Sequence, residues 1–377
     1  MKISIETAKL IDVIDIATRF VAKNATLPIL QNIYFKASID TLLLRATDME
    51  KYIEIELPCT VKAEGAITVN AKMFSDIMKT IEEKDVEFSV DAKSQVMTIK
   101  SAKDNFEING ISASEYVALP EVPKENSITL DSQTFAEGIA KVEYAVTEKN
   151  FSPVLTGVLL KIKDEKIVFV GTDSFRLAEY KINTSIKDAD FSLIVPKMTM
   201  NDIQKIAEYA IANESDEFQI QYSDNLIAFQ VTIKDLKILA TSLLIQGNFP
   251  EYDREEIMPK TFNTKVMVDK NLCEKAIRKI GILTRDINNY IQIETSKDSV
   301  IISSGKTDKG AGTTTIPAII EGESVTLGIN GKYITDFIRI IKGDEMHINI
   351  VDSQKPMILQ DKDDASYRYV VRPLINS

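Results

Sequence analysis

The stretch that decides the fold is Val168-Phe169-Val170-Gly171-Thr172-Asp173, because a matching stretch, Leu42-Leu43-Leu44-Arg45-Ala46-Thr47-Asp48, occurs earlier in the chain. Both end in a Thr-Asp pair after an apolar run, and the two pairs lie 125 residues apart. Pro28 and Pro153, which precede them, are separated by the same 125 residues. A constant offset between matching segments indicates a fold that is built from repeats.

A third, fainter copy follows the same plan. It begins at Val266-Met267-Val268 and continues through Asn289-Tyr290-Ile291-Gln292-Ile293 to Val300-Ile301-Ile302. The second half of each copy repeats as well, since a short strand pattern leads into a helix pattern in all three. These strand patterns are Thr68-Val69-Asn70, Ile194-Val195-Pro196 and Gly328-Ile329-Asn330.

Alternating apolar and polar runs, such as 86–90 and 96–99, follow each of these helices, and they are typical of half-buried antiparallel strands. We therefore predict an α+β fold of three repeated domains, each made of two strand–helix–strands units. Proline-bearing stretches interrupt helices and sheet ladders alike, which makes them candidate linkers. Such stretches at 119–123 and 249–259 divide the chain into domains at 1–122, 126–251 and 258–377.

Composition narrows the class of protein without deciding its function. No apolar run approaches the roughly 20 residues that a membrane span needs. The only two cysteines, Cys59 and Cys273, lie far apart and give neither a disulfide framework nor a metal-ligand spacing. We therefore expect a cytoplasmic protein without metal or cofactor. The net charge of −11 argues against nucleic acid, unless the basic side chains gather on one surface.

The search for catalytic residues favours a binding protein over an enzyme. The single histidine, His347, lies in the alternating run 346–350 and is expected to be an ordinary strand residue. The Thr-Asp pairs allow two interpretations: carboxylates for acid/base or metal chemistry, or aspartates that accept backbone hydrogen bonds in a turn. Recurrence at the same place in two repeats favours the turn. An enzyme with a site at Asp48 or Asp173 remains the alternative.

Basic side chains recur on the predicted helices. Lys275, Arg278 and Lys279 share one face of a helix expected from about residue 270 to 286. A charged helix face is most often simply solvated, and repetition on six helices raises the odds of a functional surface without settling them. Any surface that faces DNA would be only mildly basic, as contacts without base specificity require. The predicted DNA-facing residues are Arg19, Lys23, Lys72, Lys79, Lys141, Lys149, Lys197, Lys205, Lys275, Arg278, Lys279, Arg339 and Lys342.

Five segments together carry a resemblance to a known family. They are 26–30 (Thr-Leu-Pro-Ile-Leu), 47–50 (Thr-Asp-Met-Glu), 172–178 (Thr-Asp-Ser-Phe-Arg-Leu-Ala), 248–252 (Asn-Phe-Pro-Glu-Tyr) and 369–374 (Tyr-Val-Val-Arg-Pro-Leu). In this order, and on a threefold repeat, they resemble the beta subunit of bacterial DNA polymerase III, the sliding clamp family.

The resemblance implies a non-catalytic processivity factor for DNA replication. The family forms a head-to-tail homodimeric ring around double-stranded DNA, with antiparallel sheets outside and helices lining the hole. Expected partners are DNA of any sequence, the polymerase catalytic subunit, a clamp loader and other proteins that carry a clamp-binding motif, with no membrane association. A repeat-built scaffold for protein interactions that does not bind DNA is the alternative.

The resemblance also assigns sites. It places the dimer interface at Phe106 and Ile108 on one side, and at Ile282 and Leu283 on the other. It predicts a peptide-binding cleft at Leu155, Thr172, Ser174, Phe175, Arg176, Leu177, Pro250, Arg254, Asn330, Tyr333, Val370, Val371, Arg372, Pro373 and Leu374.

Two departures from the family leave the preferred peptide open. The family usually has Gly-His where this chain has Ser174-Phe175. Its tail commonly ends Met-Pro-x-Arg-Leu, whereas this chain ends Arg372-Pro373-Leu374-Ile375-Asn376-Ser377.

Overall fold

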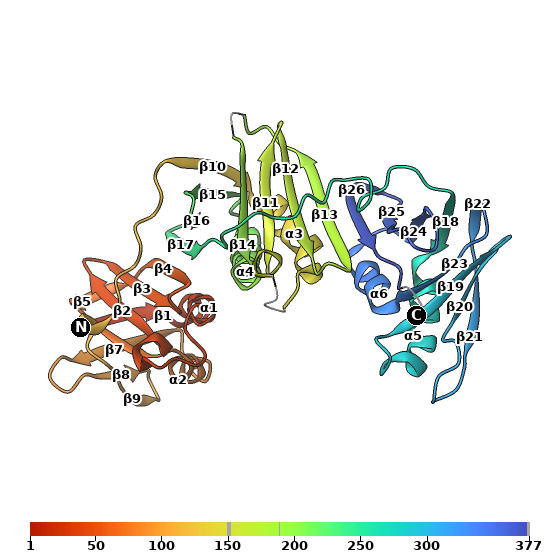
Figure 1. Cartoon of the computed structure of the whole chain (residues 1–377). Helices are drawn as coiled ribbons and strands as arrows, with labels where there is room; N and C mark the ends of the chain where they lie inside the picture. The colour runs from red at the N-terminus through yellow and green to blue at the C-terminus, as the bar shows by residue number, and fades with distance from the viewer. Residues whose placement is uncertain (149–151, 188, 375–377) are drawn as a thin grey trace. The chain divides into compact units, whose positions relative to one another are not determined.

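The structure is a computed structural model that describes residues 1–148, 152–187 and 189–374. It contains two compact units (Figure 1). Unit 1 comprises Met1–Glu137 and Met198–Ile245, and unit 2 comprises Gly138–Lys197 and Gln246–Ser377. In the described part of the chain, no helix is long and apolar enough to cross a membrane.

Unit 1 contains two antiparallel sheets. The five-stranded sheet has the order β5 (Thr60–Ala63), β1 (Lys2–Glu6), β7 (Asp85–Asp91), β8 (Val96–Lys100) and β9 (Asn105–Asn109). The eight-stranded sheet has the order β10 (Asn126–Asp131), β15 (Glu217–Tyr222), β16 (Leu226–Ile233), β17 (Leu236–Leu243), β4 (Lys51–Pro58), β3 (Thr41–Thr47), β2 (Asn32–Ser38) and β6 (Gly65–Asn70).

Unit 2 also contains two antiparallel sheets. The nine-stranded sheet has the order β14 (Phe191–Pro196), β11 (Gly157–Lys163), β12 (Lys166–Thr172), β13 (Arg176–Asn183), β26 (Asp364–Val371), β25 (Met357–Asp361), β24 (Glu345–Ile350), β18 (Thr264–Asp269) and β22 (Ile319–Gly322). The four-stranded sheet has the order β21 (Thr313–Pro317), β20 (Ser299–Ser303), β19 (Tyr290–Ser296) and β23 (Thr326–Asn330).

The helices follow the strands as the repeats predict. They are α1 (Thr7–Ala17), α2 (Ala71–Met78), α3 (Ser132–Val142), α4 (Lys197–Ala212), α5 (Lys270–Thr284) and α6 (Gly331–Ile340). Asn70, Asp269 and Asn330 cap α2, α5 and α6, because each side-chain oxygen accepts a backbone N–H of the first turn at 2.8–3.0 Å. The short 3-10 turns are η1 (Pro28–Gln31), η2 (Ala113–Glu115), η3 (Glu143–Ala145) and η4 (Pro153–Leu155).

The core of unit 1 shows how a helix joins two sheets. Phe74 of α2 is fully buried, with its ring centroid 4.8 Å from that of Phe35 in β2 and 5.5 Å from that of Phe88 in β7. Because Phe35 and Phe88 belong to different sheets, one aromatic side chain holds both sheets to the helix. Truncating such a residue to alanine typically costs about 3–5 kcal/mol.

Each later repeat shares a sheet with the repeat before it. Strand β17 of the second repeat pairs with β4 of the first, from Lys237 opposite Glu56 to Ser242 opposite Lys51. Strand β26 of the third repeat pairs with β13 of the second, and Val371 lies opposite Arg176. The compact units therefore do not coincide with the sequence repeats. The predicted α+β class and its antiparallel strands are confirmed.

Candidate functional site

The Thr-Asp pairs form turns, as their recurrence predicts. Thr172 Oγ1 donates to the carbonyl of Arg176 at 2.6 Å, and Asp173 Oδ1 accepts the N–H groups of Phe175 and Arg176 at 3.0 Å each. Asp48 accepts the corresponding N–H groups in the first repeat at 2.9 and 3.0 Å. Both aspartates are occupied by backbone donors, so their predicted structural role is confirmed.

The second of these turns positions Arg176 in unit 2. Its Nη1 donates to Asp336 Oδ2 at 2.7 Å, its Nε to Asp173 Oδ2 at 3.0 Å, and its Nη2 to the carbonyl of Tyr144 at 2.8 Å. Its guanidinium also lies 4.7 Å from the ring centroid of Tyr333. Burial opposes the charge of Arg176, but Tyr369 and the two carboxylates raise its pKa above the usual value. The side chain is therefore a fixed cation.

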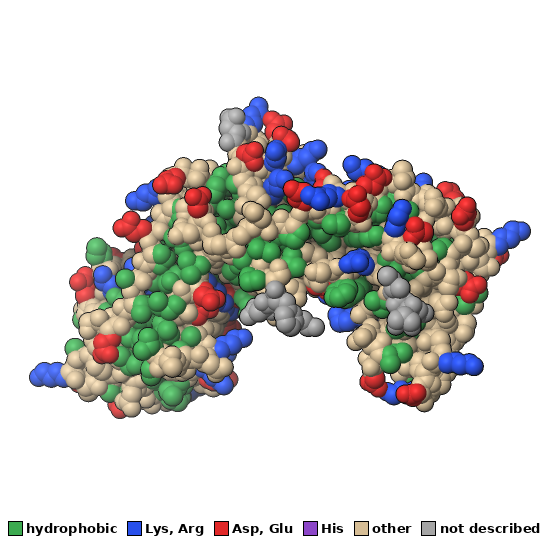
Figure 2. Space-filling model, viewed as in Figure 1, with side chains coloured by type: hydrophobic (Ala, Val, Ile, Leu, Met, Phe, Trp, Pro, Cys, Tyr) green, Lys and Arg blue, Asp and Glu red, His purple; other side chains and the backbone are tan. Residues whose placement is uncertain are grey.

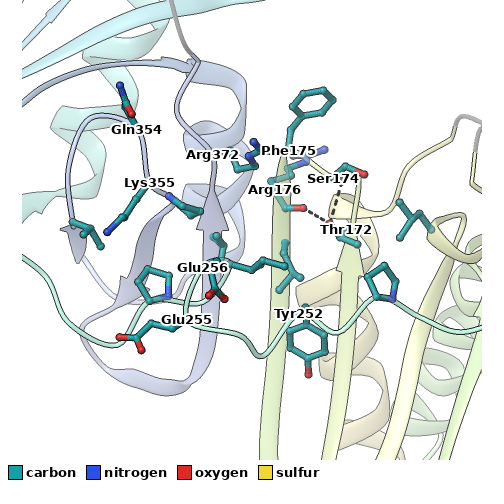
Figure 3. Close-up of a pocket in the computed structure, with 18 of the residues that line it drawn as sticks. Thr172, Ser174, Phe175, Arg176, Tyr252, Glu255, Glu256, Gln354, Lys355 and Arg372 are labelled. Atoms are coloured by element: carbon teal, nitrogen blue, oxygen red, sulfur yellow. Dashed lines mark hydrogen bonds between the residues drawn. The ribbon is translucent and has the colours of Figure 1, made fainter.

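Arg176 lines a cavity of about 820 Å³ in unit 2 (Figure 3). The cavity is formed by the β12–β13 turn, the linker after β17 and the loop between β24 and β25. Many of its wall residues are apolar, and Arg176, Arg372 and Lys355 add positive charge. The predicted cleft residues that line it are Leu155, Thr172, Ser174, Phe175, Arg176, Leu177, Pro250, Val370 and Arg372.

The other predicted cleft residues lie outside the lining of this cavity. Tyr333 stacks on Arg176, Asn330 caps α6, and Val371 is fully buried in the ladder opposite Arg176. The backbone N–H of Leu374 donates to the carbonyl of Gly328 at 2.7 Å, which fixes the chain after Pro373. Arg254 lines a neighbouring groove instead. These six residues do not line the cavity but form its support or lie beyond it, and their assignment to a peptide-binding cleft stays a prediction.

Sequence reasoning found Pro250 but missed the rest of the linker wall and the wall that the β24–β25 loop contributes. The missed lining residues are Phe249, Tyr252, Glu255, Glu256, Ile257, Pro259, Thr261, Val351, Gln354, Lys355 and Pro356. One signal was present, since Phe249 and Tyr252 are two aromatic side chains on either side of Pro250, which was itself predicted to line the cleft. Tyr252 is half-buried; burial and a hydrogen-bonded Glu179 raise its phenol pKa.

Most predicted DNA-facing residues that the structure describes are exposed. These are Arg19, Lys23, Lys72, Lys79, Lys205, Lys275, Arg278, Lys279, Arg339 and Lys342. Several have acidic neighbours, such as Lys79 with Asp15 at 2.6 Å and Arg278 with Glu274 at 2.9 Å.

Three of the predicted basic residues differ from the rest. Lys141 is a correction: it is 7% exposed, its ammonium group pairs with Asp364, and it lies 4.4 Å from the ring centroid of Tyr180. Lys197 is half-buried between Glu143 and Glu148, at 3.9 and 3.4 Å. Lys149 lies outside the described residues.

The predicted dimer residues lie on or near two sheet ends. Phe106 is half-buried on β9, the last strand of the five-stranded sheet. Ile108 on the same strand is only 2% exposed, so its side chain belongs to the core of unit 1, and its place in the dimer interface stays a prediction. In unit 2, Ile282 is 63% exposed, and Leu283 lies beside Gly312, next to β21.

Comparisons with known proteins agree over nearly the whole chain. The family models for the N-terminal, central and C-terminal domains of the DNA polymerase III beta subunit match residues 1–120, 129–251 and 255–375. The beta sliding clamp of Staphylococcus aureus is 28% identical over 364 residues, which cover 94% of both chains. That of Staphylococcus epidermidis is 27% identical over 384 residues, which cover 99% of both.

Solved structures show the same fold. The DNA polymerase sliding clamp of Bacillus subtilis matches all of both chains with a TM-score of 0.91 at 25% identity. The DNA polymerase III beta subunit of Thermotoga maritima matches with a TM-score of 0.92 at 21% identity. The prediction of three clamp-type domains is confirmed, whereas their exact boundaries stay predictions. The chain therefore belongs to the DNA polymerase III beta subunit family, the non-catalytic sliding clamps of DNA replication.

Proposed function

We propose that two copies of the chain close into a ring around duplex DNA and tether the replicative polymerase to it. A closed ring stays on DNA by topology, so weak and sequence-independent contacts suffice. Tethering keeps the polymerase at a high effective concentration near its template. A clamp loader, and repair proteins that bind the same cleft, complete the proposed set of partners.

The sheet joints between repeats carry this proposal. In both internal joints, the last strand of a second half-repeat (β17 or β26) pairs with the last strand of the first half of the preceding repeat (β4 or β13), which follows the Thr-Asp turn. The remaining strands of these two kinds are β9 and β21, and both lie at the ends of their sheets in the described chain. A third joint of the same kind, formed between two copies, supports a heterologous interface that closes.

The ladders also supply a register for this third joint. Glu54 pairs with Leu239 in the first internal joint. Equivalent positions in the repeats are found by starting in the strand before each helix and following the paired residues from strand to strand. By this route Thr313 is the counterpart of Glu54, and Asn105 is the counterpart of Leu239. Thr313 of one copy would then lie opposite Asn105 of the other.

The same register brings Phe106 opposite Gly312, next to the predicted interface residue Leu283. A Cβ atom on Gly312 would lie 3.0 Å from Leu283 Cδ1, so a side chain paired with Gly312 on that face lies close to Leu283. Phe106 and Leu283 were assigned by resemblance alone, and the register reaches the same contact from internal repeats.

Disulfide trapping tests the joint. The variant N105C/T313C, in a C59S background, should form covalent dimers under mild oxidation, because Cβ atoms of directly opposed residues lie about 4.5–5.5 Å apart. The control N105C/T315C is two residues out of register and should cross-link much less. Equal cross-linking by both pairs, or by neither, would contradict the proposed register.

Retention on DNA tests the ring. After loading onto nicked circular plasmid, the protein should remain bound in a gel-filtration column and should be released when a restriction enzyme linearises the plasmid. An ordinary DNA-binding protein ignores DNA ends, and a scaffold without affinity for DNA is not retained at all. Either behaviour would refute encirclement.

We further propose that the 820 Å³ cavity receives a short peptide anchor from partner proteins. An apolar cavity with a few fixed polar groups suits this role. Phe175 is 52% exposed at its edge, so the preferred anchor is expected to offer it an apolar or aromatic contact. Peptides selected from a random display library should lose binding to L177K but not to K265Q, an exposed strand lysine outside the cavity. Equal retention by both variants would exclude the cavity.

A further inference from the structure

A second groove of unit 2, of about 700 Å³, lies between the linker and one face of the nine-stranded sheet. Its floor includes Leu159, Val168 and Ile194, all of which are buried. It shares Phe249, Pro250 and Tyr252 with the proposed peptide cavity, so the linker separates two adjoining sites.

Four lysines distinguish this groove from the rest of an acidic protein. Lys163 lies directly opposite Lys166 in the ladder, and Lys161 and Lys181 flank Val168 from the two neighbouring strands. Figure 2 shows several Lys and Arg side chains, with Asp and Glu side chains among them, near the top of the view, where β11, β12 and β13 lie in Figure 1. None of the four lysines has an ion pair among the residues that the structure describes.

Like charges directly opposite each other destabilise a sheet. The arrangement therefore carries a cost in the free chain that an anionic ligand would remove. The net charge of −11 makes this local excess of positive charge the more unusual. Charge complementarity thus selects an acidic ligand for the groove.

The surroundings favour an acidic peptide over a nucleic acid. Asp164, Glu251 and Asp253 also line the groove, and they would repel a continuous phosphate backbone. A peptide can place its carboxylates at the lysines and its apolar atoms on the floor. A peptide anchored in the adjoining cavity also needs only to cross Phe249 and Pro250 to reach the lysines.

We propose that the lysine groove binds an acidic segment next to the peptide anchor of a partner protein. This inference rests on the proposed function of the cavity and adds a charge requirement to it. Partners with acidic residues beside their anchor would bind more tightly than partners with neutral ones, so the groove would rank partners that share an anchor.

Fluorescence anisotropy at 50 mM salt, a low ionic strength at which the Debye length is above 10 Å, tests the proposal. Three probes share one library-selected anchor peptide and differ in its extension, which consists of glutamates, of serines or of lysines. Each extension is attached in turn to the N-terminal and to the C-terminal end of the anchor. Octaglutamate without an anchor serves as a fourth probe. The glutamate extension should tighten binding about tenfold over serine, the sum of several weak ion pairs, and high salt should abolish the gain.

The variant K166E isolates the groove. It places a glutamate opposite Lys163, which forms a favourable cross-strand pair, so the sheet is expected to remain folded. K166E should lose the gain from the glutamate extension and the binding of octaglutamate, yet bind the serine-extended anchor normally. The controls K36E and K265E change exposed strand lysines outside the groove and should keep the gain.

The outcomes separate the two proposals. Binding of the serine-extended anchor that L177K leaves unchanged, with octaglutamate still bound in a K166E-sensitive way, would overturn the cavity but support the groove. Equal affinity for glutamate and serine extensions would overturn the groove alone. Binding of a single-stranded oligothymidylate through the same lysines, without binding of octaglutamate, would also overturn it and identify a nucleic-acid site.

Discussion

Two buried ion pairs occupy equivalent positions in the two internal joints. Lys51 follows the first Thr-Asp turn and pairs with Asp202 of α4, and its Nζ also donates to the carbonyl of Arg19 at 2.7 Å. Arg176 follows the second turn and pairs with Asp336 of α6. A buried ion pair adds little net stability, but removing one partner leaves the other charge buried without a counter-charge. These residues therefore constrain the joints more than they strengthen them.

The substitution D202N should destabilise unit 1 by about 3–5 kcal/mol, because it leaves the Lys51 ammonium buried without a counter-charge. Thermal unfolding should show a clearly lower melting temperature. The control K205A, on the same helix and exposed, should change stability by no more than about 0.5 kcal/mol. A melting temperature for D202N that matches K205A would contradict the account of the joint.

The thiols should be unreactive at neutral pH. Burial, with a smaller contribution from Asp40, raises the pKa of Cys59 to about 11, and burial with Asp269 raises that of Cys273 to about 12. The thiolate is the nucleophile, and an ordinary thiol has a pKa of about 8.5, so iodoacetamide should alkylate Cys59 at pH 8 roughly a hundredfold more slowly than free cysteine. Mass spectrometry of the intact chain measures the rate, and fast alkylation at pH 8 would contradict the raised pKa values.

The same shifts predict a loss of stability at alkaline pH. The folded chain favours the neutral thiols, so their contribution is complete below the unfolded pKa of about 8.5 and declines as the pH rises towards the folded values. The melting temperature of C59S should therefore fall less than that of the parent chain between pH 8.5 and 11. An identical fall in both proteins would refute this linkage.

Lys141 shows where residue-level reasoning from sequence ends. Helical periodicity indicates which residues share a face, but it does not reveal what covers that face. Here Asp364, 223 residues later in the chain, pairs with the lysine, and Tyr180 and Tyr367 pack against its ammonium group. The turn role of Asp173 was predictable because its hydrogen-bond donors, Phe175 and Arg176, are its neighbours in sequence.

At the scale of elements, the repeat pattern predicted strands and helices well but not how the repeats join. The alternation in 86–90 and 96–99 matches β7 and β8, and the helix pattern from about 270 matches α5. Pairing of β17 with β4 is non-local, and nothing in either strand's own pattern identifies the partner. For the same reason only Pro250 of the linker's cavity wall was predicted, since the rest depends on what side chains such as Tyr252 pack against.

Helix α5 presents a basic face that includes Lys275 and Lys279. Lys275 and Lys279 are exposed and have no ion pair among the described residues, whereas Arg278 pairs with Glu274. For binding to short linear DNA, K275Q/K279Q should reduce the slope of log affinity against log salt by up to about two, since each phosphate contact contributes roughly 0.9. The control K265Q should keep the slope. A slope unchanged in the double variant would remove α5 from the proposed DNA surface.

At the scale of the whole molecule, the proposed dimer depends on a few apolar side chains. F106D and I282D should each weaken dimerisation by at least about thirtyfold, the effect of losing a contact worth roughly 2 kcal/mol. Sedimentation from micromolar to nanomolar concentration measures this. The control I39D changes an isoleucine that is 79% exposed on the β2–β3 turn, and it should remain dimeric. A parent chain that is monomeric throughout would refute the ring.

The sharing of sheets across repeats has a consequence for dissecting the protein. A fragment that stops at residue 122 would lose β17, so the amides and carbonyls of β4 that now bond to it would face water as an open template for other chains. A single repeat on its own should therefore tend to aggregate. A fragment that keeps β17 should aggregate less, because β17 covers the edge of β4. Limited proteolysis should then release stable fragments that keep the paired strands of a joint together, and not fragments cut at the repeat boundaries.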